Sequence, residues 1–208
     1  MKVLGVGLQK TGTTTLGVCL REFGFRHQSY SVRAAQMYAH GSLSDLLLWA
    51  DRFESFDDVP WALMYREFDQ RYPGSRFILT RRRSEALWFD SLAKHMHRMG
   101  PKSATLEMNE AIYGRPDPQN DRDVAIGVYQ AHLQSVRDYF RDRPGDMIEL
   151  CWEAGDGWRE LAEFLERPAP HCRFPHANRA PGLRERWQQR WKARSRRRSR
   201  LGRVADDE

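Results

Sequence analysis

The sequence predicts an α/β fold in which helices cover both faces of a central, mostly parallel sheet, giving three layers. Two observations predict it. Short apolar segments suited to buried strands alternate along the chain with segments of helical periodicity. The first expected strand, residues 3–8, runs into a loop rich in glycine and threonine that leads directly into a helix. Such a strand–loop–helix unit is typical of an anion-binding α/β protein.

The loop has the sequence Gly5-Val6-Gly7-Leu8-Gln9-Lys10-Thr11-Gly12-Thr13-Thr14-Thr15, and Leu16, Leu20 and Phe23 follow at helical spacing. Free amides at a helix N-terminus, the positive end of the helix dipole and a lysine together favour a phosphate or sulfate group. The nucleoside-triphosphatase pattern would put glycine directly before the lysine, whereas here Lys10 precedes Gly12. An ordinary glycine- and threonine-rich turn before a helix is the alternative interpretation.

The remaining elements follow in order. Further strands are expected after Gly24 and over residues 53–56, 76–80 and 147–152. Further helices are expected within residues 31–51 with a break near Gly41, over 61–72, after Ser84, over 123–143, and from about 157 to 165. Ser84 and Asp156 are the expected N-caps of the helices that they precede. Residues 100–119 are expected to form a loop, which could act as a flap over an acceptor site.

A second charged motif follows the strand at 76–80. Arg81, Arg82 and Arg83 stand at the carboxyl end of that strand, and Ser91 lies about two turns into the next helix. An arginine fork and a hydroxyl group placed in this way can converge on one phosphate. A solvated run of charges followed by an unrelated serine is the alternative for this motif taken alone.

The order Gln-Lys-Thr-Gly-Thr-Thr resembles the 5′-phosphosulfate loop of P-loop sulfotransferases, in particular small bacterial-type members. The resemblance covers most of residues 1–180 and implies a P-loop-type fold and a nucleotide-binding transferase that uses 3′-phosphoadenosine 5′-phosphosulfate. It implies that the donor is held by Gln9, Lys10, Thr11, Gly12, Thr13 and Thr14 at its 5′ end, and by Arg82 and Ser91 at its 3′-phosphate. The chain departs from the family pattern at Arg83-Ser84, where Asp-Pro is usual. It also lacks the final Arg-Lys-Gly motif, for which Arg179 is the proposed substitute.

Transfer of a sulfuryl group needs a base for the acceptor's proton and a positive group for the leaving oxygen. Lys10 is the expected positive group. The resemblance points to Asp58, two residues before Pro60, as the base, and the alternative is that Asp58 or Asp57 caps the following helix. His132 is expected to be a buried core residue. The spacing of His95 and His97 does not suit a metal pair, so no metal site is predicted.

Composition limits the other functions. The 208 residues fit one domain over 1–182, followed by a basic helix and tail over 183–208 that carries the whole net charge of +6. Nucleic-acid binding is therefore not expected except through that arginine-rich tail. No apolar run is long enough for a membrane span, and Met1 leads straight into the first strand, which favours a cytoplasmic protein.

The preferred function is thus sulfuryl transfer to a hydroxyl or amine, on a small-molecule, glycan or lipid acceptor, by a chain that could form a homodimer. Two alternatives stay open at this point. One is a nucleotide-dependent phosphotransferase, for which no magnesium ligand set is evident in the sequence. The other is a non-catalytic, nucleic-acid-associated protein whose binding would depend on the tail and on salt concentration.

Overall fold

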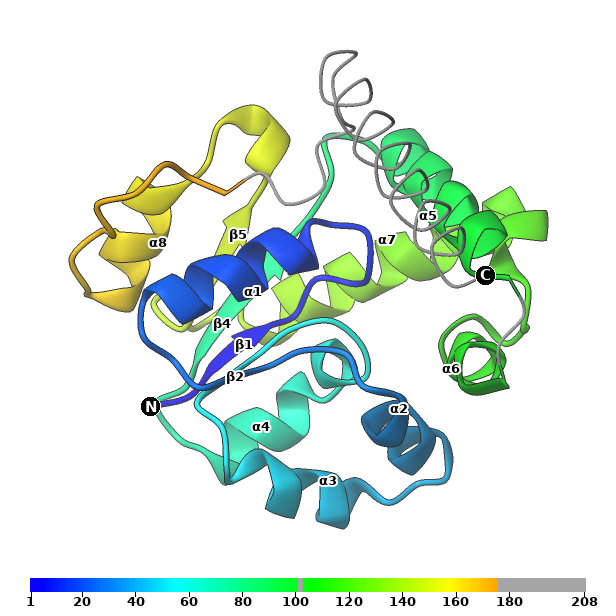
Figure 1. Cartoon of the computed structure of the whole chain (residues 1–208), viewed down its shortest axis with the longest axis horizontal. Helices are drawn as coiled ribbons and strands as arrows, with labels where there is room; N and C mark the ends of the chain where they lie inside the picture. Colours follow the sequence, from blue (N-terminus) through cyan, green and yellow to red (C-terminus); the bar gives the residue numbers. More distant parts are fainter. Residues whose placement is uncertain (101–102, 176–208) are drawn as a thin grey trace, which may run out of the picture. The chain divides into compact units, whose positions relative to one another are not determined.

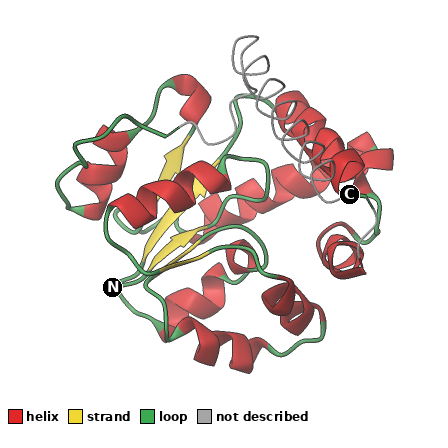
Figure 2. Ribbon diagram, viewed as in Figure 1, coloured by secondary structure: helices red, strands yellow, loops and turns green. Residues whose placement is uncertain are grey.

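The computed structural model describes residues 1–100 and 103–175. It contains a sheet of five strands in the order β2-β3-β1-β4-β5, and every neighbouring pair is parallel (Figure 2). The strands are β1 (Val3–Gly5), β2 (His27–Gln28), β3 (Ser55–Phe56), β4 (Arg76–Thr80) and β5 (Met147–Leu150). The predicted parallel sheet is confirmed.

Helices lie on both faces of the sheet, as the alternating pattern predicts (Figure 1). The helices are α1 (Thr13–Glu22), α2 (Val32–Ala39), α3 (Leu43–Ala50), α4 (Tyr65–Arg71), α5 (Glu85–Met99), α6 (Ser103–Tyr113), α7 (Arg122–Tyr139) and α8 (Trp158–Leu165), with short 3-10 turns η1 (Trp61–Leu63), η2 (Pro118–Asn120) and η3 (Trp152–Ala154). The three-layer α/β/α fold is therefore confirmed. No helix among the described residues combines the length and the apolar character that crossing a bilayer requires.

Each face of the sheet has its own hydrophobic core. Helices α1 and α8 cover one face, where Leu16 and Leu161 pack against Val3 and Ile78 of the sheet. Helices α4, α5 and α7 contribute to the larger core on the other face, which also holds residues of α2, α3 and α6. Burial of both faces explains why the central strands β1 and β4 are largely apolar, whereas the edge strand β2 is polar and only half-buried.

The strand order places the loop after β1 at the centre of the sheet. The chain builds β2 and β3 on one side of β1 and then crosses to build β4 and β5 on the other. In open parallel sheets, ligands bind at the carboxyl ends of the strands where the order reverses in this way. The loop from Gly7 to Gly12 lies at this position, so the fold itself singles out this edge of the sheet.

Several expected elements are confirmed and others are wrong. The break near Gly41 separates α2 from α3, and the Ser84 side chain accepts a hydrogen bond from the Leu87 amide at the start of α5. The prediction of a loop over residues 100–119 is wrong, because residues 103–113 of this segment form α6. Glycines with positive φ, Gly100 and Gly114, stand on either side of that helix and marked its ends in the sequence.

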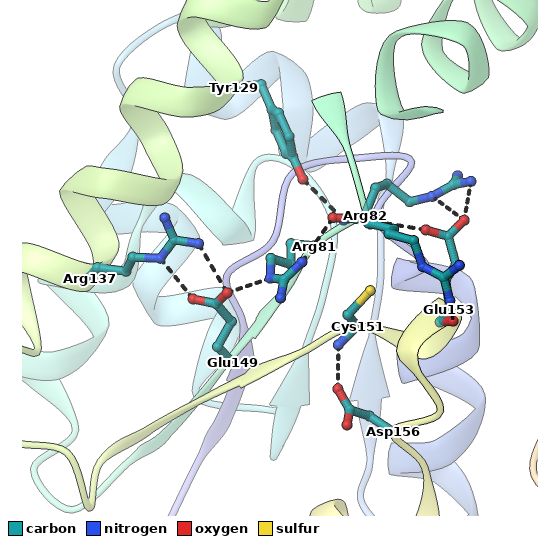
Figure 3. A network of polar contacts seen from close by, with 9 residues as sticks. Arg81, Arg82, Tyr129, Arg137, Glu149, Cys151, Glu153 and Asp156 are labelled. Atoms are coloured by element: carbon teal, nitrogen blue, oxygen red, sulfur yellow. Dashed lines mark hydrogen bonds and ion pairs between the residues drawn. The ribbon is translucent and has the colours of Figure 1, made fainter. Parts of the chain in front are cut away.

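The prediction that Asp156 caps α8 is wrong. Gly157 is the residue at the N-cap position, and the Asp156 carboxylate instead accepts a hydrogen bond of 2.7 Å from the Cys151 amide, which closes the turn after β5 (Figure 3). The expected helix over 61–72 is divided into η1 and α4. The expected domain end at residue 182, the basic segment over 183–208 and Arg179 lie outside the described residues.

Candidate functional site

The loop between β1 and α1 has an unusual backbone. Lys10 has φ of 72° and Gly12 has φ of 99°, both in the left-handed region that residues other than glycine seldom adopt. Glycine is required at position 12, because a Cβ there would lie 2.3 Å from the ring of Trp152. The Trp152 indole also donates a hydrogen bond of 3.3 Å to the Gly12 carbonyl. The loop is therefore held against the segment that follows β5.

Hydrogen bonds of Thr11 connect the same loop to the sheet. The Thr11 hydroxyl donates to the Leu8 carbonyl at 2.7 Å and lies 2.7 Å from the hydroxyl of Thr80, the last residue of β4. A Cβ at Gly7 would lie 2.2 Å from that Thr80 hydroxyl, so β1 ends in close contact with β4. These contacts leave the loop little freedom and fix the direction in which α1 begins.

The N-terminus of α1 has hydrogen-bond donors without a partner in the described part of the chain. Its N-cap residue is Gly12, and no side chain of the described residues caps the helix. The first intrahelical bond runs from the Leu16 amide to the Gly12 carbonyl, so the amides of Thr13, Thr14 and Thr15 have no acceptor within the helix. Together with the helix dipole, these amides form a site suited to an anion.

Lys10 stands next to this helix N-terminus. Burial lowers the pKa of its ammonium group from 10.5, and the nearby Asp58 carboxylate counteracts that effect, while Arg98 and Arg82 lower the pKa further. A lysine that is partly removed from water and surrounded by other cations gains more from a bound anion than a fully solvated lysine does. The charges around the loop therefore favour an anionic ligand.

Asp58 is joined directly to α1. Its Oδ2 atom accepts a hydrogen bond of 3.0 Å from the Thr13 hydroxyl, and its Oδ1 atom accepts one of 2.8 Å from the Val59 amide. Asp58 has φ of 65°. Among the described residues no side chain caps η1, so the structure does not support the alternative in which Asp58 or Asp57 caps the helix after Pro60. The chain folds so that the carboxylate points toward the anion site.

The environment of Asp58 raises its pKa to about 6. Burial is the largest cause, and the neighbouring Asp57 adds to it, whereas the bonds from Val59 and Thr13 and the charge of Lys10 act in the opposite direction. A carboxylate with a pKa near 6 is ionised at neutral pH and yet accepts a proton far more readily than an ordinary aspartate. Asp58 therefore has the properties of a general base.

Arg82, from the second motif, follows β4, and its guanidinium lies against the carboxylate of Glu153 (Figure 3). Its Nε and Nη2 atoms donate to one oxygen of Glu153 at 2.9 and 2.5 Å, and its Nη1 atom donates to the Lys10 carbonyl at 3.3 Å. The other oxygen of Glu153 accepts from the Arg83 amide at 2.8 Å. Since guanidinium has five N–H groups, two remain for a further acceptor. Glu153 thus orients Arg82 without using all of its donors.

A second ion-pair group lies on the α7 side of Arg82. Arg81 and Arg137 both bind the Glu149 carboxylate (Figure 3). These residues line an open cavity of about 540 Å³ that also borders Arg82 and Tyr129. Four arginines and two glutamates line this cavity, so its charge is positive on balance, which extends the favourable potential for anions beyond the loop itself.

Helix α5 reaches the loop through Trp88, whose indole donates to the Gln9 carbonyl at 3.0 Å. Ser91, His95 and Arg98 follow at spacings that keep them on the same side of α5 as Trp88. Arg98 donates to the His95 ring at 3.3 Å, and burial together with the charges of Lys10 and Arg98 lowers the pKa of His95. The helical spacing was visible in the sequence, yet it did not indicate which side of α5 faces the loop.

Sequence reasoning also missed the contact between the loop and α6. The Gln9 side-chain amide donates to the Tyr113 hydroxyl at 2.7 Å, and both residues are buried. The carbonyl oxygen of the same side chain, Gln9 Oε1, is buried and has no hydrogen-bond partner among the described residues. His132, expected in the core, is only partly buried, and its Nε2 atom lies 2.7 Å from the Val6 carbonyl.

These residues fit the 5′ end of a phosphosulfate donor. The free amides at α1, Lys10 and the unused N–H groups of Arg82 are donors for anionic oxygens, and they occur at one edge of the sheet. The hydroxyl of Thr13 is already bound to Asp58. No group of three or more potential metal ligands occurs among the described residues.

The fold and this site define an anion-binding site in a three-layer α/β/α domain, and comparison with known proteins gives its family. Residues 2–182 match the family described as "Sulfotransferase domain", and the chain belongs to that family. It is also similar to "Ava biosynthesis cluster protein M" of Aspergillus versicolor. The two are 24% identical over 215 aligned positions, which cover 85% of this chain and 80% of the relative.

Proposed function

We propose that this protein transfers a sulfuryl group from 3′-phosphoadenosine 5′-phosphosulfate to a hydroxyl or amine acceptor. The observation that carries the proposal is the uncapped N-terminus of α1, with Lys10 beside it and the Asp58 carboxylate bonded to its first residue. Membership of the sulfotransferase family supports a reaction of this class. The donor, when bound, would supply the activated sulfuryl group and the phosphate that leaves.

In this proposal, the loop from Gln9 to Thr14 holds the 5′ end of the donor. The amides of the first turn of α1 bind anionic oxygens, and the ammonium group of Lys10 stabilises the negative charge that develops on the leaving oxygen. Gly12 allows the close contact with Trp152 that keeps the loop in this conformation. Arg82 and Ser91 are proposed to bind the 3′-phosphate.

Asp58 is proposed as the base that removes the proton from the acceptor's hydroxyl or amine. Its carboxylate is ionised above pH 6, because its pKa is raised to about 6, and it stands beside the loop that would hold the donor. Proximity of this kind lets one group take the proton as the new bond forms. Activity should therefore decline as the pH falls through about 6.

We further propose a small molecule as the acceptor. The relative from Aspergillus versicolor is named as a biosynthesis cluster protein, and a small-molecule acceptor would agree with a role of that kind. Larger acceptors, glycans or lipids, are the other candidates within the same reaction class. A screen of acceptors with the labelled donor would identify the group that receives the sulfuryl unit.

The first experiment is a calorimetric titration of the full-length protein with 3′-phosphoadenosine 5′-phosphate and, separately, with ATP and magnesium. We expect saturable binding of the first ligand and much weaker binding of the second. Adenosine 5′-phosphate, which lacks the 3′-phosphate, is the matched control ligand. Tighter binding of ATP with magnesium would overturn the proposal in favour of a phosphotransferase.

A further inference from the structure

A second carboxylate lies behind Asp58, and the proposed reaction does not use it. Asp57 is fully buried, and its Oδ1 atom lies 3.3 Å from Nε2 of His27, whose side chain is also fully buried. His27 belongs to β2, and Asp57 directly follows β3, which is the next strand of the sheet. The two side chains therefore meet inside the protein as a consequence of the strand pairing.

Helix α1 covers this pair. A Cβ at Gly17 would lie 2.7 Å from Oδ2 of Asp57 and 2.7 Å from Nε2 of His27, so only glycine leaves room for both groups. The other ring nitrogen, Nδ1, lies 2.9 Å from the Ser55 hydroxyl. Ser55 pairs with His27 in the sheet register. The imidazole is thus held between a hydroxyl group and a carboxylate, away from solvent.

The charge of Asp57 needs a partner. Within the described residues, neither carboxylate oxygen of Asp57 accepts a well-formed hydrogen bond, and the basic side chain within ion-pair distance is that of His27. Burying a carboxylate without a proton or a counter-charge is strongly unfavourable. The His27 ring can supply that counter-charge as an imidazolium, in which Nε2–H faces Asp57 and Nδ1–H donates to the Ser55 hydroxyl.

We propose that His27 is a positioning residue for the reaction: as an imidazolium, with protons at both Nε2 and Nδ1, it balances the charge of Asp57 and so prevents an unbalanced negative charge from lying beside Asp58. The inference rests on the proposed function in one respect, because it takes Asp58 as the base. It adds a residue from β2, a strand that contributes none of the groups proposed to contact the donor or acceptor.

Groups from several elements act on the ionisation of Asp58, and the charge of Asp57 is one of them. Lys10 and Thr13 from the loop and α1 favour the ionised form of Asp58, and Asp57 and burial favour the protonated form. The hydroxyl of Tyr113 on α6 also interacts electrostatically with Asp58. It is itself uncharged, since burial raises its pKa well above the usual range. Of these influences, the charge on Asp57 is the one that His27 controls.

The test is a titration of Asp58 by carbon-13 NMR of its carboxyl group in the full-length protein, without donor or acceptor. We expect the midpoint to rise by about one pH unit or more in His27→Gln and to fall by a similar amount in Asp57→Asn, because like charges at short range oppose ionisation. The double variant should behave like Asp57→Asn. His40→Gln, a change at an exposed histidine after α2, is the control and should leave the midpoint unchanged.

An unmoved midpoint in His27→Gln would overturn the inference whatever Asp57→Asn does, because a purely structural pair affects stability and not the titration of Asp58. If His27→Gln fails to fold, the double variant and Asp57→Asn decide, and the absence of a downward shift in either overturns it. The acidic limb of the pH–rate profile should move with the midpoint. A shifted midpoint with an unmoved limb would overturn the role of His27 in the reaction together with Asp58 as the base, whereas the donor proposal is tested separately by the calorimetric titration.

Discussion

Replacing Asp58 with asparagine should stabilise the protein and remove most of its activity. The pKa of Asp58 rises from 3.8 to about 6 in the folded protein. The folded state therefore binds this proton more tightly than the unfolded state does, and ionisation of Asp58 costs stability as the pH rises from about 4 through 6. A shift of roughly two units corresponds to about 3 kcal/mol at pH 8.

Asparagine removes the charge and keeps the local structure. Asp58 has φ of 65°, a conformation that asparagine tolerates nearly as well as aspartate and that alanine does not. The side-chain oxygen of asparagine can still accept from the Val59 amide, and the Thr13 hydroxyl can turn to accept from the new amide group. The comparison therefore isolates the effect of the charge.

Thermal unfolding at two pH values measures the prediction. At pH 8 we expect Asp58→Asn to raise the free energy of unfolding by about 3 kcal/mol, or the melting temperature by about 6–12 °C for a chain of this size. At pH 4 the gain should fall below about 1 kcal/mol, because Asp58 is then almost wholly protonated in the folded state and only about 60% ionised in the unfolded state. Turnover at pH 8 should fall by about 10²–10⁴ if Asp58 is the base.

Asp142→Asn is the matched control, because Asp142 is exposed near the end of α7. It should change stability by less than about 0.5 kcal/mol at either pH. A gain in Asp58→Asn that is the same at pH 4 and pH 8, or a loss at pH 8, would refute the reasoning from burial and like charge. Near-normal turnover would refute the role as base.

Three further predictions test the loop, the arginine and the helix contact. Lys10→Ala should lower turnover by more than about tenfold at unchanged melting temperature, since its charge stabilises the leaving oxygen; normal turnover in this variant would remove Lys10 from the mechanism. Arg82→Ala should weaken the binding of 3′-phosphoadenosine 5′-phosphate by about 1.5–3 kcal/mol in calorimetry and barely change the binding of adenosine 5′-phosphosulfate. Arg81→Ala is the control. Equal losses of affinity for both ligands would contradict a 3′-phosphate site. Gly17→Ala should lower the free energy of unfolding by more than about 2 kcal/mol in denaturant titrations, because its Cβ would meet the buried Asp57 and His27 side chains. Gly127→Ala, in open space on α7, should be neutral or stabilising by up to about 1 kcal/mol. Similar values for the two variants would argue against the close contact at Gly17.

The sequence predicted the fold and the loop well, because both depend on local patterns. Apolar runs of a few residues and a glycine-rich turn before a helix specify β1, the loop and α1 without reference to the rest of the chain. The N-cap at Ser84 is local in the same sense. Arg82 was also recognised from its position after a strand, and the structure brings its guanidinium to the carbonyl of Lys10.

The rest depended on contacts between residues far apart in the sequence. Nothing near Glu153 indicates that its carboxylate orients Arg82, which lies 71 positions earlier. The pairing of His27 with Asp57 follows from the register between β2 and β3, and periodicity does not specify a register. Helix α6 was missed because glycine and proline near its ends were given more weight than the helix-forming residues between them.

The two outer strands of the sheet have a consequence for how the protein behaves at high concentration. Within the described residues, β2 and β5 form the edges, and they span only two and four residues. An unpaired strand edge can recruit the edge of another molecule, and very short edges are one way in which natural proteins avoid that association. Substitutions that lengthen β2 toward Phe25 or Ser29 should therefore be avoided in any attempt to make the protein more stable, because a longer free edge would promote self-assembly into aggregates.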